Sequence, residues 1–139
     1  MVLNTLTPNV MVEDVEETVE WYEAVLDADL VATLPPDESE SWWAQIVIND
    51  VTLMFQTRDS LAEEFPEMEA ESGPGTATFY IDVDNIRHLY DTLQDEVTVV
   101  QELSRNEYGR NQFAIQDCNG YILWFAEPIT NEPDGPIVR

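Results

Sequence analysis

The sequence predicts an α+β fold made of two tandem modules, each with the element order βαβββ. Three observations support this prediction. A strand-like run followed by an amphipathic helix occurs twice, and the valine that ends the first run, Val12, has its counterpart 71 positions later at Val83. The last strand-like run of each half also matches, since Leu53 and Leu123 lie 70 positions apart. Between the helix and the last strand, each half has room for two further strands.

The first module spans residues 6–57 and opens with a strand at Asn9–Val12, followed directly by a helix. Apolar residues at helical spacing indicate this helix: Val15, Val19, Tyr22 and Leu26. We expect Asp14 to cap its first turn, and Glu17 three residues later completes the pattern of a capping box. The remaining strands of the module are predicted at 30–34, 42–48 and 51–55, separated by turns at Pro35-Pro36 and Asn49-Asp50.

The second module spans residues 77–128 and repeats this order. A strand at 77–83 precedes a helix indicated by Ile86, Leu89, Tyr90 and Leu93. Three strands follow at 98–103, 112–116 and 121–125, with turn residues at Tyr108-Gly109 and at 118–120.

Two segments lie outside the modules. Residues 58–76 carry Leu61, Phe65 and Met68 among acids, followed by Ser72-Gly73-Pro74-Gly75, which predicts a short helix and then a flexible linker. In the tail, 129–139, two prolines disfavour regular structure. We expect the whole chain, 1–139, to form a single domain.

The charge balance is the strongest signal in the composition. The chain has 29 acidic residues against 5 basic ones, a formal net charge of −24. Such a surplus repels itself at low ionic strength, whereas about 1 M salt shortens the Debye length to about 3 Å. Because 44% of the residues are hydrophobic, we predict a folded protein with an acidic surface adapted to high salt. A site that attracts cations is the alternative, and the charge argues against a nucleic-acid partner.

The cellular compartment is predicted from the cysteine content and from the lack of membrane or signal segments in the sequence. Cys118 is the single cysteine, so no disulfide forms within the chain, which fits a reducing cytoplasm. The sequence shows neither an apolar run of about 18 residues nor the basic and apolar segments of a signal peptide. We therefore expect a cytoplasmic protein with no membrane contact.

Three short motifs occur along the chain in an order that is typical of a known family. Residues 7–22 contain a strand, a Val-x-Asp corner and a Trp-Tyr pair; residues 77–86 repeat the strand and corner; residues 113–127 contain Asp-Cys-Asn-Gly before an apolar run. In this order, over 6–128, they resemble the glyoxalase/bleomycin-resistance/dioxygenase (vicinal-oxygen-chelate) superfamily, although Cys118 stands where proline is usual there. The resemblance implies that the sheets curl into an open surface with a cleft, and that the protein forms a homodimer.

The resemblance also implies where a metal would bind. Metal-dependent members hold a divalent ion with four His, Glu or Gln side chains, on the first and last strand of each module. The matching positions here are Thr7, Met54, Thr78 and Trp124. A threonine hydroxyl is a weak neutral ligand, a thioether prefers soft ions, and an indole donates only N–H. We therefore expect no metal and no other cofactor.

Strand alternation then predicts which side chains line the cleft. Side chains two apart share a face, so residues in step with Met54 and Trp124 face the cleft, while Leu53, Phe55 and their counterparts face the helices. The predicted ligand-binding set is Thr7, Asn9, Met54, Gln56, Thr78, Tyr80 and Trp124. Among these, Trp124 is the first candidate, because its flat face suits a planar or cationic ligand. As alternatives, Trp124 and Met54 fill the curled sheet as core, Tyr80 makes a core or dimer contact, and the two amides are ordinary surface groups.

Four further residues remain open. His88 is expected on a helix, facing solvent or partly packed. Asp82 would serve as a base only if buried, and exposure is the expected state. Trp42 and Trp43 are adjacent, so one ring points to each side of a strand, and the sequence does not say which faces the cleft.

These features favour a metal-free protein that binds a small molecule, as bleomycin-resistance proteins do, with a ligand of unknown identity. The alternative is a metal-dependent lyase, isomerase or dioxygenase of the glyoxalase type. A metal-free enzyme that uses Asp82 or Tyr80 is a third hypothesis, although no nucleophile–base pair is visible.

Overall fold

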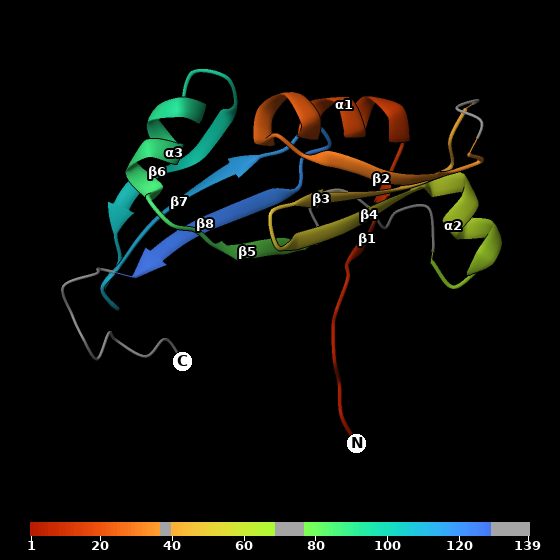
Figure 1. Cartoon of the computed structure of the whole chain (residues 1–139), viewed down its shortest axis with the longest axis horizontal. Helices are drawn as coiled ribbons and strands as arrows, with labels where there is room; N and C mark the ends of the chain where they lie inside the picture. Colours follow the sequence, from red (N-terminus) through yellow and green to blue (C-terminus); the bar gives the residue numbers. More distant parts are fainter. Residues whose placement is uncertain (37–39, 69–76, 129–139) are drawn as a thin grey trace. The chain divides into compact units, whose positions relative to one another are not determined.

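The computed structural model describes residues 1–36, 40–68 and 77–128. The chain divides into two compact units, Met1–Pro74 and Gly75–Arg139, which we call unit 1 and unit 2. Within the described residues each unit holds one four-stranded sheet that stays open, and the two sheets have the same strand order (Figure 1). Over the same residues, no helix combines the length and the apolar character needed to span a membrane.

Unit 1 contains a mixed sheet with the order β1-β4-β3-β2. Its first and last strands in the chain, β1 and β4, run parallel, and the other neighbours are antiparallel. Its elements are β1 (Asn9–Val12), α1 (Val15–Leu26), β2 (Asp29–Leu34), β3 (Trp43–Ile48), β4 (Val51–Thr57) and α2 (Arg58–Glu64).

The core of unit 1 lies between the sheet and α1, which covers one face (Figure 1). Strand alternation turns Ala44, Ile46 and Phe55 toward the helix, and all three are fully buried. From α1, Tyr22 meets them, with its ring centroid 5.1 Å from that of Phe55. The helix therefore packs through the apolar stripe that its spacing predicts. At its start, the carboxylate of Asp14 accepts the backbone N–H of the residue three positions on, at 2.9 Å, which is the predicted N-cap.

Unit 2 repeats this arrangement in the order β5-β8-β7-β6, again with its first and last strands parallel. Its elements are β5 (Thr78–Asp82), α3 (Ile86–Leu93), β6 (Thr98–Arg105), β7 (Arg110–Gln116) and β8 (Ile122–Pro128). The registers confirm the repeat: Asn9 lies beside Met54 in unit 1, and Tyr80 lies beside Trp124 in unit 2. The predicted α+β fold with two βαβββ modules is therefore confirmed.

Aromatic side chains fill the core of unit 2. Phe113 of β7 is fully buried, with its ring centroid 5.0 Å from that of Tyr90 on α3 and 5.2 Å from that of Phe125 on β8. These spacings are those of favourable edge-to-face and tilted aromatic pairs. One ring thus joins the helix to both central strands of the sheet.

The hairpin between β7 and β8 is held by one buried carboxylate. The Oδ1 atom of Asp117 accepts the backbone N–H groups of Asn119 and Tyr121 at 2.8 and 2.9 Å. Gly120 adopts φ 91°, a left-handed conformation that favours glycine. The Asp-x-Asn-Gly motif therefore shapes this turn, within which the exposed Cys118 Sγ accepts a hydrogen bond from Asn119 Nδ2 at 3.6 Å.

The N-terminus of α3 is capped from another strand. Asn85 occupies the N-cap position with φ 58° and makes no capping bond with its side chain. Instead, the Glu127 carboxylate on β8 accepts the backbone N–H groups of Asn85 and Ile86, at 2.8 and 3.0 Å. A negative charge at a helix N-terminus is also favoured by the helix dipole.

We expect Glu127→Ala to lower the free energy of unfolding by about 1 kcal/mol, the usual loss when a capping side chain is removed. Glu127→Gln should lose less, because its amide oxygen still accepts one bond. Guanidinium titration followed by circular dichroism measures both. Equal stability of the alanine variant and the wild type would mean that Glu127 does not cap α3.

Residues 58–76 and 129–139 are only partly described. The short helix predicted after the first module forms as α2, and Leu61 of that helix is buried. The predicted flexible linker at Ser72-Gly73-Pro74-Gly75 and the tail 129–139 lie outside the described residues.

Candidate functional site

The sheet face turned away from α1 in unit 1, and from α3 in unit 2, carries the residues predicted to bind a ligand. We call it the far face. In unit 2, Thr78, Tyr80 and Trp124 all lie on it, because strand register puts Tyr80 beside Trp124 and Thr78 two positions before Tyr80. Tyr80 is 51% exposed and Trp124 is half-buried. Two aromatic side chains thus stand side by side on neighbouring strands, with part of their surface open to solvent.

An arginine completes this part of the far face. Arg110, the first residue of β7, reaches across β8 to Asp82 of β5, and its Nη1 and Nη2 lie 3.3 and 3.2 Å from Asp82 Oδ1. The guanidinium carbon lies 5.8 Å from the centroid of the Tyr80 ring, within cation–π range. The Arg110 side chain is only 13% exposed, whereas that of Asp82 is 71% exposed.

The far face of unit 1 is more polar and partly covered. Asn9 donates from Nδ2 to Gln56 Oε1 at 2.9 Å, and Gln56 donates from Nε2 to Ser60 Oγ and Glu64 Oε1 of α2, at 2.8 and 3.2 Å. Gln56 is 4% exposed. The α2 helix therefore covers the far face where β4 ends, and the Gln56 amide is bonded to that helix.

Met54 lies next on this face, half-buried beside the exposed Asn9, and its backbone N–H donates to the Pro8 carbonyl at 2.9 Å. Thr7 precedes β1 and is half-buried. Trp43 lies on the same face, because its register partner is Gln56. Of the two adjacent tryptophans, Trp43 is therefore the one on the far face.

The four positions that the resemblance predicts for metal ligands offer poor ligands for a divalent ion. In unit 1 they are Thr7 and Met54, and in unit 2 Thr78 and Trp124, which offer two hydroxyls, a thioether and an N–H donor. Over residues 1–36, 40–68 and 77–128, no three His, Cys, Asp or Glu side chains gather so as to hold a metal ion.

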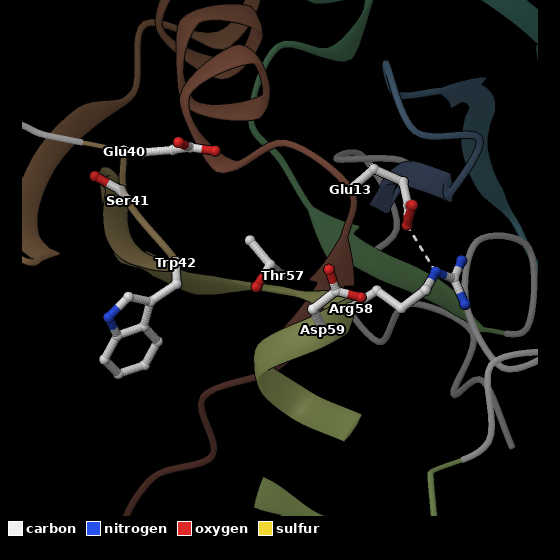
Figure 2. Close-up of a pocket in the computed structure, with 7 residues that line it drawn as sticks. All are labelled: Glu13, Glu40, Ser41, Trp42, Thr57, Arg58 and Asp59. Atoms are coloured by element: carbon white, nitrogen blue, oxygen red, sulfur yellow. Dashed lines mark hydrogen bonds and ion pairs between the residues drawn. The ribbon is translucent and has the colours of Figure 1, made fainter. Parts of the chain in front are cut away.

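A separate pocket opens in unit 1 where the strands meet α2 (Figure 2). It has a volume of about 320 Å³ and is lined by Glu13, Glu40, Ser41, Trp42, Thr57, Arg58 and Asp59. The Arg58 Nε lies 2.6 Å from Glu13 Oε2. Figure 2 shows the Trp42 ring directed away from this pair, so carboxylates and hydroxyls dominate the pocket. Among the residues that line it Trp42 is the one aromatic, and none of the predicted ligand-binding residues is among them.

The structure therefore groups the predicted residues within each unit: Thr7, Asn9, Met54 and Gln56 in unit 1, and Thr78, Tyr80 and Trp124 in unit 2. That the two groups line one cleft stays a prediction. His88 is exposed on α3, and Asp82 is exposed, both as expected. Sequence reasoning missed Arg110, because the strand was predicted to begin at 112. The signal was present, since Arg110 is in step with Gln112 along the strand.

Comparison with known proteins places the fold in a family. A model of the Glyoxalase/Bleomycin resistance protein/Dioxygenase superfamily matches residues 3–125. No curated protein matches the sequence significantly. Among solved structures, TioX from Micromonospora sp. ML1 is similar with a TM-score of 0.72 at 16% identity, covering 91% of this chain and 99% of that one.

Two further solved structures have a similar fold. A glyoxalase/bleomycin resistance protein/dioxygenase from Nocardioides has a TM-score of 0.74 at 15% identity, covering 100% of this chain and 91% of that one. A protein of unknown function from Agrobacterium tumefaciens str. C58 has a TM-score of 0.72 at 14% identity, covering 93% of this chain and 97% of that one. At these identities, the likeness establishes the fold alone.

Proposed function

Because this chain belongs to the Glyoxalase/Bleomycin resistance protein/Dioxygenase superfamily, we propose that it binds a planar small molecule on the far face of unit 2, without a metal ion. The observation that carries the proposal is the pairing of Tyr80 with Trp124 on neighbouring strands, half-open to solvent. Small-molecule sites combine aromatic walls with a few polar groups that fix orientation. Thr78 on the same face supplies a hydroxyl beside the aromatic pair.

The absence of a metal in this proposal is supported by the chemistry of the donor set. Neither Met54 nor Trp124 offers an oxygen or an imidazole nitrogen, and Thr7 and Thr78 offer only neutral hydroxyls. Binding energy therefore comes from stacking and hydrogen bonds. Adding Mg²⁺, Mn²⁺ or Zn²⁺ should leave the affinity of the protein for an aromatic ligand unchanged. After prolonged incubation with the metal, the ligand should be recovered without chemical conversion. Metal-dependent turnover would favour the glyoxalase-type alternative.

The Trp indole signals provide the test of the binding site. The chain has four tryptophans, so a ¹⁵N-labelled sample gives a distinct indole N–H signal for each, assigned by single Trp→Phe variants. We expect planar aromatic compounds to shift the Trp124 signal saturably, with one molecule bound per chain. Trp42, 42% exposed in unit 1, is the internal control and should not respond.

Replacing Trp124 by alanine should reduce the affinity for such a compound by roughly tenfold or more, because stacking on the indole accounts for about 1–3 kcal/mol per ring. The measurement is isothermal titration. The matched control is Tyr108→Ala, which removes an aromatic side chain that is 47% exposed on the β6–β7 turn. Saturable binding that Trp124→Ala leaves unchanged would place the ligand elsewhere on the protein.

Homodimer formation and a cytoplasmic, high-salt setting stay predictions. Sedimentation in 1 M KCl measures the first.

A further inference from the structure

We propose that Arg110 determines the charge of the ligand, so that the far face of unit 2 takes a planar aromatic anion. The ring of this ligand lies against Tyr80 and Trp124, and the ligand's carboxylate pairs with the Arg110 guanidinium. The inference rests on the proposed function and names the ligand class of the same site.

The position of the guanidinium carries the first step. Its carbon lies 5.8 Å from the Tyr80 ring centroid, and the register partner of Tyr80 is Trp124. Because the guanidinium lies over the Tyr80 ring, a ligand ring stacked on the neighbouring Trp124 has its edge beside the guanidinium. Among the described residues of unit 2, Arg110 is the one cationic side chain on this face, since Arg87 lies on α3 and Arg105 is in register with Asn111, on the other face.

The pairing with Asp82 leaves the guanidinium able to accept a second anion. Both Nη atoms contact the same oxygen, Oδ1, at 3.3 and 3.2 Å, so the contact lacks the two parallel bonds of a bidentate pair. Asp82 is 71% exposed, and water competes for its carboxylate. A ligand carboxylate that brings both oxygens to the fork makes the stronger pair.

Burial decides the sign of the local field. The Arg110 side chain is 13% exposed, so its charge is screened by salt much less than that of the exposed Asp82. The net charge of −24 opposes an anionic ligand at long range. In 1 M KCl, however, the Debye length is about 3 Å, so distant acids contribute little while a contact pair persists. The Arg110 guanidinium then provides a positive charge at the edge of the aromatic pair, where the ligand carboxylate would lie.

The test compares 2-naphthoate with 2-naphthamide in 1 M KCl, because these probes share shape and ring but differ in charge. Isothermal titration gives the affinities, and the Trp124 indole signal gives the location. For the wild type, we expect naphthoate to bind roughly tenfold tighter, as a charge-assisted bidentate pair provides.

Three variants separate recognition from a structural role. Arg110→Gln should abolish the preference by lowering the naphthoate affinity roughly tenfold, and Arg110→Lys should keep part of the preference, since it retains charge without the fork. Asp82→Asn should increase the preference, because the competing carboxylate is gone. A pair that served only to tie β5 to β7 across β8 would instead make Asp82→Asn and Arg110→Gln weaken the binding of both probes alike.

The outcomes are distinguishable. If neither probe shifts the Trp124 signal, the proposed function and this inference both fail. If naphthamide binds at Trp124 as tightly as naphthoate, or if Arg110→Gln lowers both affinities equally, only the inference is overturned. Circular dichroism of each variant in the same buffer confirms that it is folded.

Discussion

Replacing Phe113 by alanine is expected to lower the free energy of unfolding by about 3–5 kcal/mol, the loss typical of a buried phenylalanine. Phe113 is fully buried, and its ring lies 5.0 and 5.2 Å from the rings of Tyr90 and Phe125. The substitution therefore leaves a cavity at the point where α3 meets β7 and β8. For a chain of this length, such a loss lowers the melting temperature by roughly 10 °C or more.

The matched control makes the same chemical change at an exposed position. Phe65 follows α2 and is 48% exposed, so Phe65→Ala should change stability by no more than about 0.5 kcal/mol. Guanidinium titration in 1 M KCl, followed by circular dichroism, measures both variants. If Phe113→Ala were as stable as Phe65→Ala, the aromatic contacts described for unit 2 would be wrong.

Much of the fold could be predicted because its causes are local. The apolar spacing of Val15, Val19 and Tyr22 produces α1, and Asp14 caps it through a bond to the residue three positions later. Strand alternation correctly assigned Leu53 and Phe55 to the helix-facing side, and both are buried. Patterns of this kind need no knowledge of distant residues.

The helix cap of unit 2 shows where local patterns fail. By the repeat, the corner before α3 should work like the corner before α1. Asn85 instead adopts φ 58° and makes no capping bond with its side chain, and the cap comes from Glu127. These residues are 42 positions apart, and their meeting depends on the register of β5 against β8. Sequence spacing does not contain that register.

The candidate site also has features that the sequence predicted and features that depend on contacts between distant residues. The repeat correctly predicted which positions lie next to each other, since Asn9 neighbours Met54 and Tyr80 neighbours Trp124. Parity also assigned Gln56 to the far face, but its burial follows from hydrogen bonds to α2, whose position the sequence did not indicate. Arg110 was missed because the strand was predicted to begin two residues later, at 112, and because its ion pair with Asp82 reaches across β8, which sequence spacing does not indicate.

The composition leads to the second large effect: raising KCl from 0.1 to 2 M should raise the melting temperature by about 10 °C or more. Two like charges about 10 Å apart in water repel by roughly 0.4 kcal/mol, and a Debye length of about 10 Å at 0.1 M leaves about a third of that. Over a net charge of −24, many such pairs sum to a few kcal/mol. At 2 M salt nearly all of this repulsion is screened, so the folded state gains that free energy.

Charge variants separate screening from other effects of salt. Glu20, Glu23 and Glu102 are exposed on α1 and β6, and the triple change to glutamine removes three charges without altering side-chain size. In 0.1 M KCl the triple variant should melt several degrees above the wild type, and in 2 M KCl the two should melt together. Salt that acts by strengthening apolar burial instead raises both curves in parallel. A constant gap between the curves at all concentrations would therefore show that charge repulsion is not what salt relieves in this protein.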